Sequence, residues 1–594
     1  MKNKMKDIKT GVVSLLACMV FSACEDFLDP NEYALREEDK VFTISTYVNS
    51  MPFAIYSCVP ASTGLSMSEA TDEGDLVDAS ESYQSFNTGT WNKYSNPDDQ
   101  WGTLYKGIRI ACDYLNGTDT LTWSKHRYAY PDKYNELMLN LNIGRAEAHF
   151  LRAYFYFELI KRYGDVPLIT EDLTLTPDMD FSDFKRESVA KIVDYICDEC
   201  DLVSREGRYY KSPEEIVQMT NNGRDLLANP YRDTLDIAYP TTGDKARFLG
   251  RATRASAYAL KAKTLIYFAS KQYNPEGDLE RWKKAAEACK KVLELPSQYY
   301  KLETNYADIF NKKSSWSKEF LFVRKSGASN SFEKEYYPVS IEGGKTTFCP
   351  SQNLVDAYEV IVDENTSVPF DWTNPEHKMS PYDNRDPRFY VSIYKHGDLY
   401  DNVVNKITLD CAEGGNSALP IYRATTTGYY LKKYVNPSLD LKNNKTDTKT
   451  WVLMRLADFY LYYAEAMNEV YGPTSAGEFD MNALEALNEV RKRAGMPSVV
   501  AVNKEQLREK IYNERRVELA FENSRWWDIR RWNYGQAFNQ DLRGVKVTIG
   551  HVNNSYEPFV VEKRVFDESK MYLYPISQSE IDKSKGNLVQ NPNW

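Results

Sequence analysis

The sequence lacks most of the residues and motifs on which familiar enzyme chemistries depend. It has five histidines in 594 residues, at positions 126, 149, 377, 396 and 551. It contains no HExxH, GxSxG or GxGxxG motif, which excludes the usual signatures of zinc proteases, serine hydrolases and dinucleotide-binding enzymes. No spacing of oxygen ligands resembles an EF-hand calcium loop. The sequence therefore favours a binding protein over an enzyme.

Positive charge and long apolar runs are also scarce. Lysine and arginine number 74 against 85 aspartates and glutamates, so the net charge is −11, which disfavours a general nucleic-acid binder. With 42% apolar and 13% aromatic residues, the composition is that of a folded globular protein. At roughly 100 to 200 residues per domain, the length predicts several lobes or a repeat array.

The N-terminus has the pattern of a secretory signal. Four lysines precede an apolar run at residues 11–21, which is too short to span a bilayer. The sequence Phe21-Ser22-Ala23-Cys24 resembles a bacterial lipobox, in which the cysteine is lipidated and becomes the mature N-terminus. A competing lipobox ends at Cys18 but leaves a shorter apolar core. We therefore predict a signal peptide at residues 1–23 and lipidation at Cys24.

The remaining cysteines do not form a disulfide framework. They number seven, at positions 58, 112, 197, 200, 289, 349 and 411, and an odd number argues against complete pairing. Cys197 and Cys200 form a CxxC motif, but they lie within residues 189–203, where apolar residues recur at helical spacing. We expect both thiols to pack as small apolar groups, with no metal site because no second pair or nearby histidine completes one.

Three segments of the chain predict helical hairpins. Helical patterns at 251–270 and 279–293, and at 451–471 and 481–494, are each separated by Gly and Pro breaks. A third hairpin combines 145–163 with 187–203, and a fourth can use 101–115. Small alanines alternate with aromatics, as in tetratricopeptide repeats, where each hairpin leaves a face that its neighbour covers. We predict a mainly α fold of about four such hairpins, with a large loop-rich region containing short strands.

Several long blocks resemble one family, the SusD/RagB outer-membrane nutrient-binding lipoproteins. The blocks are CEDFLD (24–29), RAEAHFLRAYFYFELIKRYGDVPL (145–168), NRDPRFY (384–390), RLADFYLYYAEAMNE (455–469), ERRVELAFENSRWWDIRRW (514–532) and YPISQSEIDKSKGNLVQNPNW (574–594). The resemblance covers nearly the whole chain. One departure is local, because Ala111-Cys112 stands where relatives often have Ala-Asn.

The resemblance implies a place and a partner. The family implies a lipid-anchored protein, exposed at the cell surface on the outer membrane, that acts as a lid over a SusC-like TonB-dependent transporter and binds oligosaccharide or polysaccharide. It implies four regions: the signal peptide 1–23, an N-terminal region with helical hairpins 24–296, a loop-rich ligand-binding insertion 297–450, and a C-terminal region 451–594 with the last hairpin and a closing segment. We expect no cofactor apart from the covalent lipid on Cys24. We also expect no nucleic-acid partner.

One acidic set could be taken for a catalytic cluster. Glu514, Glu518 and Glu522 recur at every fourth residue, beside Arg515, Arg516, Arg525 and Asp528. The alternative is a structural charge network next to Trp526, Trp527 and Trp532, and the family resemblance favours this alternative. We therefore nominate no catalytic residue.

Aromatic and amide side chains in loops are the candidate binding residues. A sugar offers an apolar ring face to an aromatic side chain and hydroxyls to amides and charges. Trp91, Asn92 and Tyr94 lie in a Ser/Asn/Thr/Gly-rich stretch, where the family often supplies an aromatic residue and an Asn; Trp316 lies in a second loop, with Tyr299 and Tyr300 upstream. We expect replacement of Trp91 and Trp316 by alanine to abolish glycan retention without lowering the melting temperature by more than a few degrees.

Three alternatives remain open. The cargo can be a peptide or glycopeptide, because a fold does not fix its ligand. A surface-anchored hydrolase would show turnover that is lost when one or two carboxylates are replaced. A tetratricopeptide adaptor would grip partner proteins in a groove free of large loops. The sequence leaves open the sugar, its linkage and whether a structural ion supports a loop.

Overall fold

The computed structural model describes most of the chain. The described residues are 45–60, 65–121, 123, 128–129, 131–171, 184–204, 250–297, 299–310, 317–404, 406–500 and 502–594. Within them, no helix is both long enough and apolar enough to cross a membrane.

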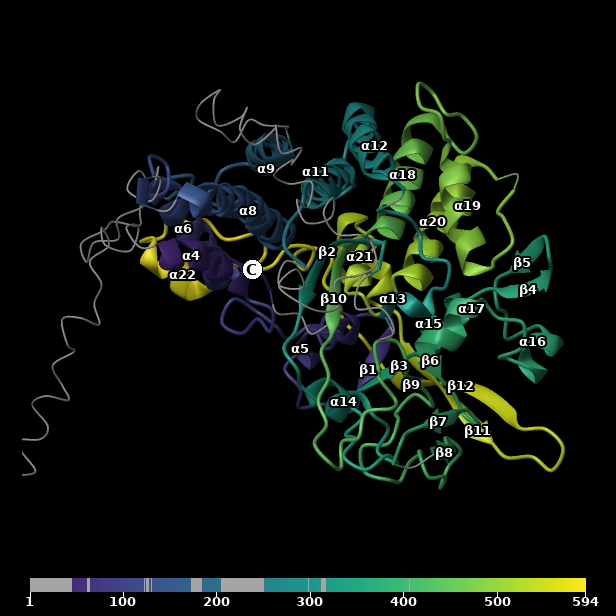
Figure 1. The fold of residues 1–594 in the computed structure, drawn as a ribbon. Helices are drawn as coiled ribbons and strands as arrows, with labels where there is room; N and C mark the ends of the chain where they lie inside the picture. Colours follow the sequence, from purple (N-terminus) through teal and green to yellow (C-terminus); the bar gives the residue numbers. More distant parts are fainter. Residues whose placement is uncertain are drawn as a thin grey trace, which may run out of the picture.

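Helices form the body of the molecule. The longer ones are α4 (Ser45–Ser57), α6 (Trp101–Gly117), α8 (Pro131–Tyr163), α9 (Val189–Ser204), α11 (Arg254–Ala269), α12 (Leu279–Leu293), α18 (Leu456–Tyr471), α19 (Ala483–Ala494), α20 (Lys504–Glu518) and α21 (Ser524–Arg531). From α6 to α19, each of these longer helices packs against the next longer one, and Figure 1 shows the resulting row. This is the predicted mainly α fold of stacked hairpins.

Small side chains let these helices approach closely. The alanines of α11, α12, α18 and α19 are buried where the helices meet, while aromatic residues such as Phe157 and Tyr267 fill the space beside them. Local signals fix the ends: Asn482 and Glu485 form a capping box at the start of α19, and Gly495 ends it in the left-handed conformation at φ 78°.

The predicted hairpins are present. Helices α11 and α12 pair, as do α18 and α19, and α8 pairs with α9. The fourth predicted hairpin uses α6, which packs against α8. Helix α8 begins at Pro131, well before the predicted start at residue 145. Helix α4 adds a further layer on α6 and α8.

One predicted helix begins too early. The pattern at 451–471 predicts a single helix, but residues Thr450–Arg455 form strand β10, and α18 starts at Leu456. Strand β10 pairs antiparallel with β2 (Phe320–Lys325), a partner far away in the sequence. The run Trp451-Val452-Leu453 suits a strand, and the distant partner decides the outcome.

The interval 297–450 is built from short elements around its own apolar cluster. Its helices are α13 (Ala307–Phe310), α14 (Ser331–Tyr336), α15 (Gln352–Ala357), α16 (Pro375–Met379) and α17 (Pro387–Ser392), and its strands are β2, β3 (Phe348–Pro350), β4 (Val360–Asp363), β5 (Thr366–Val368), β6 (Ile393–Tyr394), β7 (Leu399–Asp401), β8 (Lys406–Thr408) and β9 (Tyr430–Leu431). Buried tyrosines such as Tyr337, Tyr358 and Tyr400 dominate this cluster. The predicted region boundaries themselves stay predictions.

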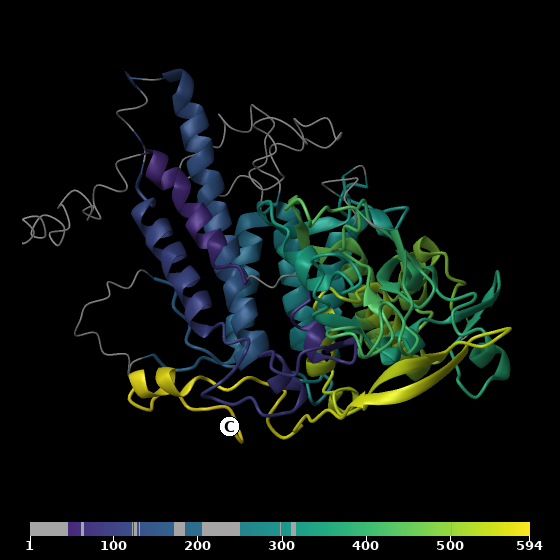
Figure 2. The same cartoon turned by 90° about the horizontal axis from the view of Figure 1, so that it is seen from below.

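The C-terminal segment ties the two ends of the molecule together. It contains η4 (Gly535–Ala537), the hairpin β11 (Leu542–Thr548) and β12 (Ser555–Glu562), and α22 (Gln578–Lys583). Figure 2 shows it running along one edge, from the β11–β12 hairpin to α22 beneath the N-terminal helices. Across the described residues, strands pair only in two-stranded antiparallel sheets, of which β11–β12 is one.

Candidate functional site

The acidic set on α20 is a buried charge network. Glu518 pairs with Arg388 at 2.8 Å, with Arg455 at 2.7 Å and with Arg493. Burial opposes ionisation of Glu518, but these three guanidinium groups hold its pKa far below the usual value. Glu514 pairs with Arg388 at 2.6 Å and with Arg491 at 2.9 Å.

The other members of this set are equally engaged. Glu522 lies beyond the end of α20 and pairs with Arg455 and Lys433, both at 2.8 Å. Asp528 pairs with Arg515 and Arg531. The side chains of all these acids are at most 4% exposed and are paired with cations, so the interpretation as a charge network is confirmed. We call Glu514, Glu518 and Glu522 with their partners the buried ion network.

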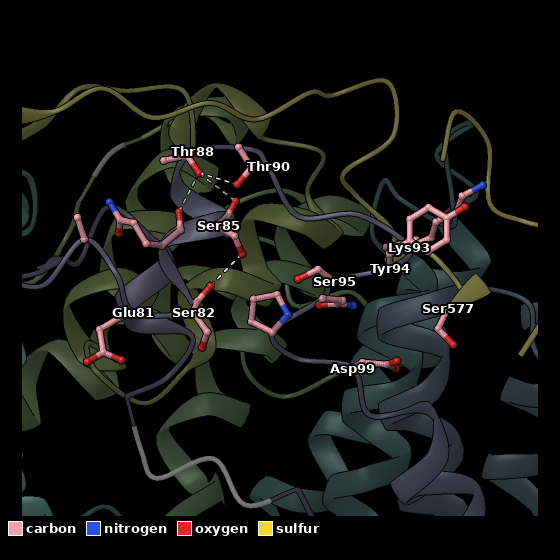
Figure 3. A pocket seen from close by; sticks show the side chains of 15 residues that line it. Glu81, Ser82, Ser85, Thr88, Thr90, Lys93, Tyr94, Ser95, Asp99 and Ser577 are labelled. Atoms are coloured by element: carbon pink, nitrogen blue, oxygen red, sulfur yellow. Dashed lines mark hydrogen bonds between the residues drawn. The ribbon is translucent and has the colours of Figure 1, made fainter. Parts of the chain in front are cut away.

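A polar pocket of about 580 Å³ lies elsewhere, between residues 79–99 and the C-terminal segment. We call it the outer pocket, and Figure 3 shows its side chains. Its lining residues carry mostly hydroxyl, amide and charged groups: Ala79, Glu81, Ser82, Gln84, Ser85, Thr88, Thr90, Lys93, Tyr94, Ser95, Asn96, Pro97, Asp99, Pro575 and Ser577.

Short-range hydrogen bonds fold the loop that forms this pocket. Helix α5 (Gln84–Asn87) begins it, and Thr88 Oγ1 donates to the Gln84 carbonyl at 3.1 Å and lies 3.0 Å from Thr90 Oγ1. The backbones of Asn92 and Ser95 then exchange two hydrogen bonds of 2.9 and 3.0 Å. Such local bonding is typical of Ser, Thr and Asn in turns, and it fixes the loop without burying it.

Trp91 anchors the loop to the core. Its side chain is 2% exposed, and its ring lies 5.0 Å from Phe86, 5.2 Å from Tyr574 and 4.6 Å from Trp594, centroid to centroid. These neighbouring side chains therefore cover the Trp91 ring. The geometry does not support Trp91 as a stacking surface, because its ring is packed against Phe86, Tyr574 and Trp594.

Tyr94 has the opposite environment. It is 76% exposed and lies at the rim of the outer pocket with Lys93, whose Nζ is 5.6 Å from the Tyr94 ring centroid. Asn92 Oδ1 accepts from the Tyr94 backbone N–H at 2.9 Å, and Asn92 Nδ2 donates to the Thr90 carbonyl at 3.1 Å. Asn92 therefore positions Tyr94, and its own amide is committed to the loop.

Acidic side chains hold the base of the loop, where Asp98 is buried and Asp99 is exposed. Asp98 accepts from Arg162 at 2.9 Å and from the Tyr574 hydroxyl at 3.1 Å, while Asp99 accepts from the Tyr163 hydroxyl at 2.6 Å. Glu69, in the short helix η1 (Ser68–Ala70), carries the carbonyl that accepts from Asn87 Nδ2 at 3.1 Å. Burial raises the pKa of the Glu69 carboxyl to about 7, although the Tyr336 hydroxyl donates to it.

Chemically, the outer pocket can bind a neutral polyhydroxylated ligand. Hydroxyls donate and accept, so they match sugar hydroxyls in either sense. The exposed ring of Tyr94 offers an apolar face with a polar tip. Charges of both signs lie at the wall, the carboxyls of Glu81 and Asp99 and the ammonium group of Lys93.

The other predicted binding residues lie apart from the outer pocket. Tyr299 and Tyr300 follow α12 in a turn, where both backbone N–H groups donate to the Pro296 carbonyl. Both are half-buried, Tyr300 packs on the main core, and neither lines the outer pocket. Trp316 and the lipidation candidate Cys24 lie outside the described residues. Their roles stay predictions.

Sequence reasoning missed most of the pocket wall. Ser82, Ser85, Thr88 and Thr90 belong to the same hydroxyl-rich stretch as Trp91, and their density was the available signal. Ser577 is almost 500 residues away in the sequence, and only the fold brings it there. The backbone N–H of Gln578 donates to the Lys93 carbonyl at 3.1 Å and fastens the two segments.

The cysteines behave as packing residues in the described part of the chain. Cys197 is half-buried and Cys200 is buried on α9; both are free thiols, and burial raises the pKa of both. Within the described residues, no group of three or more His, Cys, Asp or Glu side chains is arranged to hold a metal ion.

Comparisons with known proteins agree with this architecture. The family model for the SusD family matches residues 315–594, and a model described as starch-binding, associating with outer membrane, matches residues 26–206. SusD-like protein P2 of Formosa agariphila is 24% identical over 547 residues, covering 88% of this chain and 86% of that protein.

Solved structures show the same fold. A SusD-like protein from Bacteroides fragilis superposes with a TM-score of 0.73 at 23% identity, covering 94% of this chain and 98% of that one. A SusD-like carbohydrate-binding protein from the same organism gives 0.69 at 20% identity, covering 92% and 99%. From these matches and its stacked helical hairpins, the chain belongs to the SusD/RagB family.

Proposed function

We propose that this protein is a cell-surface glycan-binding lipoprotein that captures oligosaccharides in the outer pocket. It then acts as a lid that delivers them to a SusC-like TonB-dependent transporter. The observation that carries the proposal is the outer pocket itself, a hydroxyl-lined hollow of about 580 Å³ with an exposed tyrosine at its rim.

The size and chemistry of the outer pocket suit a sugar. Binding pockets for small ligands commonly have volumes of about 300 to 1,000 Å³. A ring stacked on Tyr94 would contribute on the order of 1 kcal/mol, by analogy with bases on aromatic side chains, because sugars are strongly hydrated. Hydroxyls of Ser82, Ser85 and Thr90 would exchange hydrogen bonds with those of the ligand. Several weak contacts together give useful affinity.

The comparisons support the ligand class. One matching family model carries a starch-binding description, and one structural neighbour is called a carbohydrate-binding protein. Both statements concern those proteins. Together with the polar lining, they favour a glycan over a peptide as the cargo.

We propose binding without bond cleavage and without a cofactor. Two carboxyls line the outer pocket, those of Glu81 and Asp99. Asp99 already accepts hydrogen bonds from the Tyr163 hydroxyl and the Trp101 backbone N–H, so it serves the fold. A glycosidase needs a matched acid and base or nucleophile across the scissile bond.

We propose that a lipid on Cys24 holds the protein on the outer membrane. Each buried CH₂ of an acyl chain contributes about 0.8 kcal/mol, so several chains give stable anchoring. Replacement of Cys24 by serine, or treatment with globomycin, should release the protein from the membrane fraction. Unchanged processing and membrane retention would contradict the anchor.

The test of the ligand class is a glycan array run beside a pool of peptides and glycopeptides. We expect retention on glycans only, with no change in the mass of the bound glycan after prolonged incubation. Retention of peptides only would establish the alternative cargo. Shortened glycans would establish a hydrolase, and loss of that turnover on replacing Glu81 would identify its acid.

A further inference from the structure

Arg530 is a buried arginine on α21 without an acidic partner. It is 2% exposed. Two other buried arginines of the same helix have such partners: Arg525 pairs with Asp72 at 2.9 Å, and Arg531 pairs with Glu465 at 2.7 Å. Among the described residues, no carboxylate forms an ion pair with Arg530. Burying a charge costs free energy unless the charge is paired, so this arginine needs an explanation.

The guanidinium of Arg530 is also short of hydrogen-bond acceptors. Nη1 donates to the Met571 carbonyl, while Nε and Nη2 are buried and have no acceptor in the described part of the chain. The carboxylate whose charge acts on it, Asp98, is itself paired with Arg162 at 2.9 Å. Burial therefore lowers the pKa of Arg530 to about 10. The group stays charged at neutral pH but receives little compensation from polar groups.

Aromatic rings surround the guanidinium instead. Five rings have their centroids between 3.8 and 5.8 Å from its Cζ atom, those of Trp91, Trp526, Phe538, Phe566 and Tyr574. The Trp526 ring is the nearest. A cation within about 6 Å of an aromatic ring is attracted to the face of that ring, most strongly where water is excluded. We call Arg530 and these five rings the aromatic junction.

The aromatic junction lies where the two segments of the outer pocket meet. Trp91 follows the pocket residue Thr90 in the loop, and Tyr574 directly precedes the pocket residue Pro575. The Trp91 and Tyr574 rings also contact each other, with centroids 5.2 Å apart. Because no acid fixes the guanidinium, the rings and the guanidinium position one another. Arg530 therefore connects α21 with both segments of the pocket wall.

An apolar side chain at position 530 would fill the space without this connection. Methionine is flexible and packs well in cores, but it lacks the charge that is attracted to ring faces. For stability alone, an unpaired buried charge is an unfavourable choice. Sequences depart from such packing rules at functional sites, which directs attention to the outer pocket beside the junction.

We propose that Arg530 is a positioning residue for the outer pocket. Its guanidinium holds the Trp91 and Tyr574 rings together, and so keeps the rim at Tyr94 in place relative to the C-terminal wall at Ser577. The consequence for glycan binding rests on the proposed function, whereas the ordering of the loop does not.

The first test measures the order of the loop without any ligand. Hydrogen exchange of the full-length protein, followed by mass spectrometry, reports the opening of backbone hydrogen bonds such as those between Asn92 and Ser95. Arg530→Met should speed exchange in peptides that cover residues 84–96 by about threefold to tenfold, the range expected when cation–π contacts are lost.

The second test is titration calorimetry with a glycan selected on the array. Arg530→Met should weaken binding by about threefold to tenfold, although Arg530 does not line the outer pocket. Arg530→Lys keeps the charge but not the planar fork of the guanidinium. It should therefore fall between the wild type and Arg530→Met in both measurements.

Arg385→Met is the matched control. Arg385 is also buried, at 1% exposed, and also forms no ion pair among the described residues, but it donates to the carbonyls of Tyr358, Pro381 and Val355. It does not line the outer pocket. Its replacement should lower the unfolding midpoint, because three carbonyls lose their donor. Exchange at residues 84–96 and glycan affinity should stay unchanged.

Three results would overturn the proposal. The first is wild-type exchange at residues 84–96 in Arg530→Met, and the second is faster exchange with unchanged glycan affinity. The third is an equal change in Arg385→Met, which would show a general loss of stability. If the wild type binds no glycan, the proposed function fails, and hydrogen exchange still decides whether Arg530 orders the loop. If Arg530→Met does not fold, Arg530→Lys decides by the same measurements.

Discussion

The buried ion network and the outer-pocket loop are both rich in polar side chains, but they use them in opposite ways. In the network, Glu518 binds three arginines and has no exposed surface. In the loop, the hydroxyls of Thr88 and Thr90 hydrogen-bond locally and stay exposed on one side. The first arrangement cannot meet a ligand, and the second can.

This difference shows where function lies in the molecule. The most conspicuous sequence blocks, such as 514–532, build the frame in which helices and loops are joined. The binding surface is a loop with weak patterning, held in place by Trp91 underneath and by Asp98 and Asp99 at its base. Changes in the frame should therefore cost stability, and changes at the rim should cost affinity.

The largest expected effect is at the centre of the frame. Glu518→Ala leaves Arg388, Arg455 and Arg493 without a shared partner, and removal of one member of a buried ion pair costs about 3 to 5 kcal/mol. Urea unfolding followed by tryptophan fluorescence measures the loss. Glu509→Ala, at an exposed position on the same helix, should change stability by less than about 0.5 kcal/mol. Equal stability of the two variants would show that the network does not support the fold.

The next effect separates Trp91 from Tyr94. Trp91→Ala removes a buried ring and should lower the free energy of unfolding by about 3 to 5 kcal/mol. The burial of Trp91 thus leads to a different expectation from the sequence, which predicts that replacing Trp91 and Trp316 by alanine lowers the melting temperature by no more than a few degrees. Tyr94→Ala, at an exposed site, should leave the unfolding midpoint nearly unchanged in the same measurement. A stable Trp91→Ala protein would return Trp91 to the candidate binding residues.

A smaller effect concerns the support of the loop at Glu69. Because burial raises the pKa of this carboxyl from 4.5 to about 7, the folded state holds its proton more tightly than the unfolded state. Its contribution to stability is complete below pH 4.5 and is lost as the pH rises through 7. Glu69→Gln should remove this part of the pH dependence, on the order of 3 kcal/mol, in unfolding curves at pH 4.5 to 8. Glu509→Gln is the control and should keep the wild-type dependence of stability on pH. If Glu69→Gln also kept that dependence, the Glu69 carboxyl would be ionised throughout this pH range, which would contradict the prediction.

Much of the fold follows from patterns within the sequence. Alanines alternating with aromatics at 251–270 predict α11, and Gly and Pro breaks predict its pairing with α12. The start of α18 could not be predicted, because strand β10 depends on β2, over a hundred residues earlier in the chain. Local propensity at Trp451 to Met454 suits helix and strand alike, so the distant partner decides.

The candidate site was predictable only in part. The stretch around Trp91 was identified by its composition, and the outer pocket does lie there. The direction of each side chain was not predictable, because a single turn at Asn92 sends Trp91 inward and Tyr94 outward. Ser577 joins the wall through a long-range contact that no local pattern encodes.

The central claim is that the outer pocket binds glycan through its exposed rim. Titration calorimetry with a glycan selected on the array tests it most directly, on the wild type, Tyr94→Ala and Tyr422→Ala. Tyr422 is 82% exposed and does not line the outer pocket, so it serves as the matched control. The account predicts that Tyr94→Ala loses about 1 kcal/mol of binding free energy while Tyr422→Ala binds as the wild type does. Unchanged affinity in Tyr94→Ala, or an equal loss in Tyr422→Ala, would contradict it.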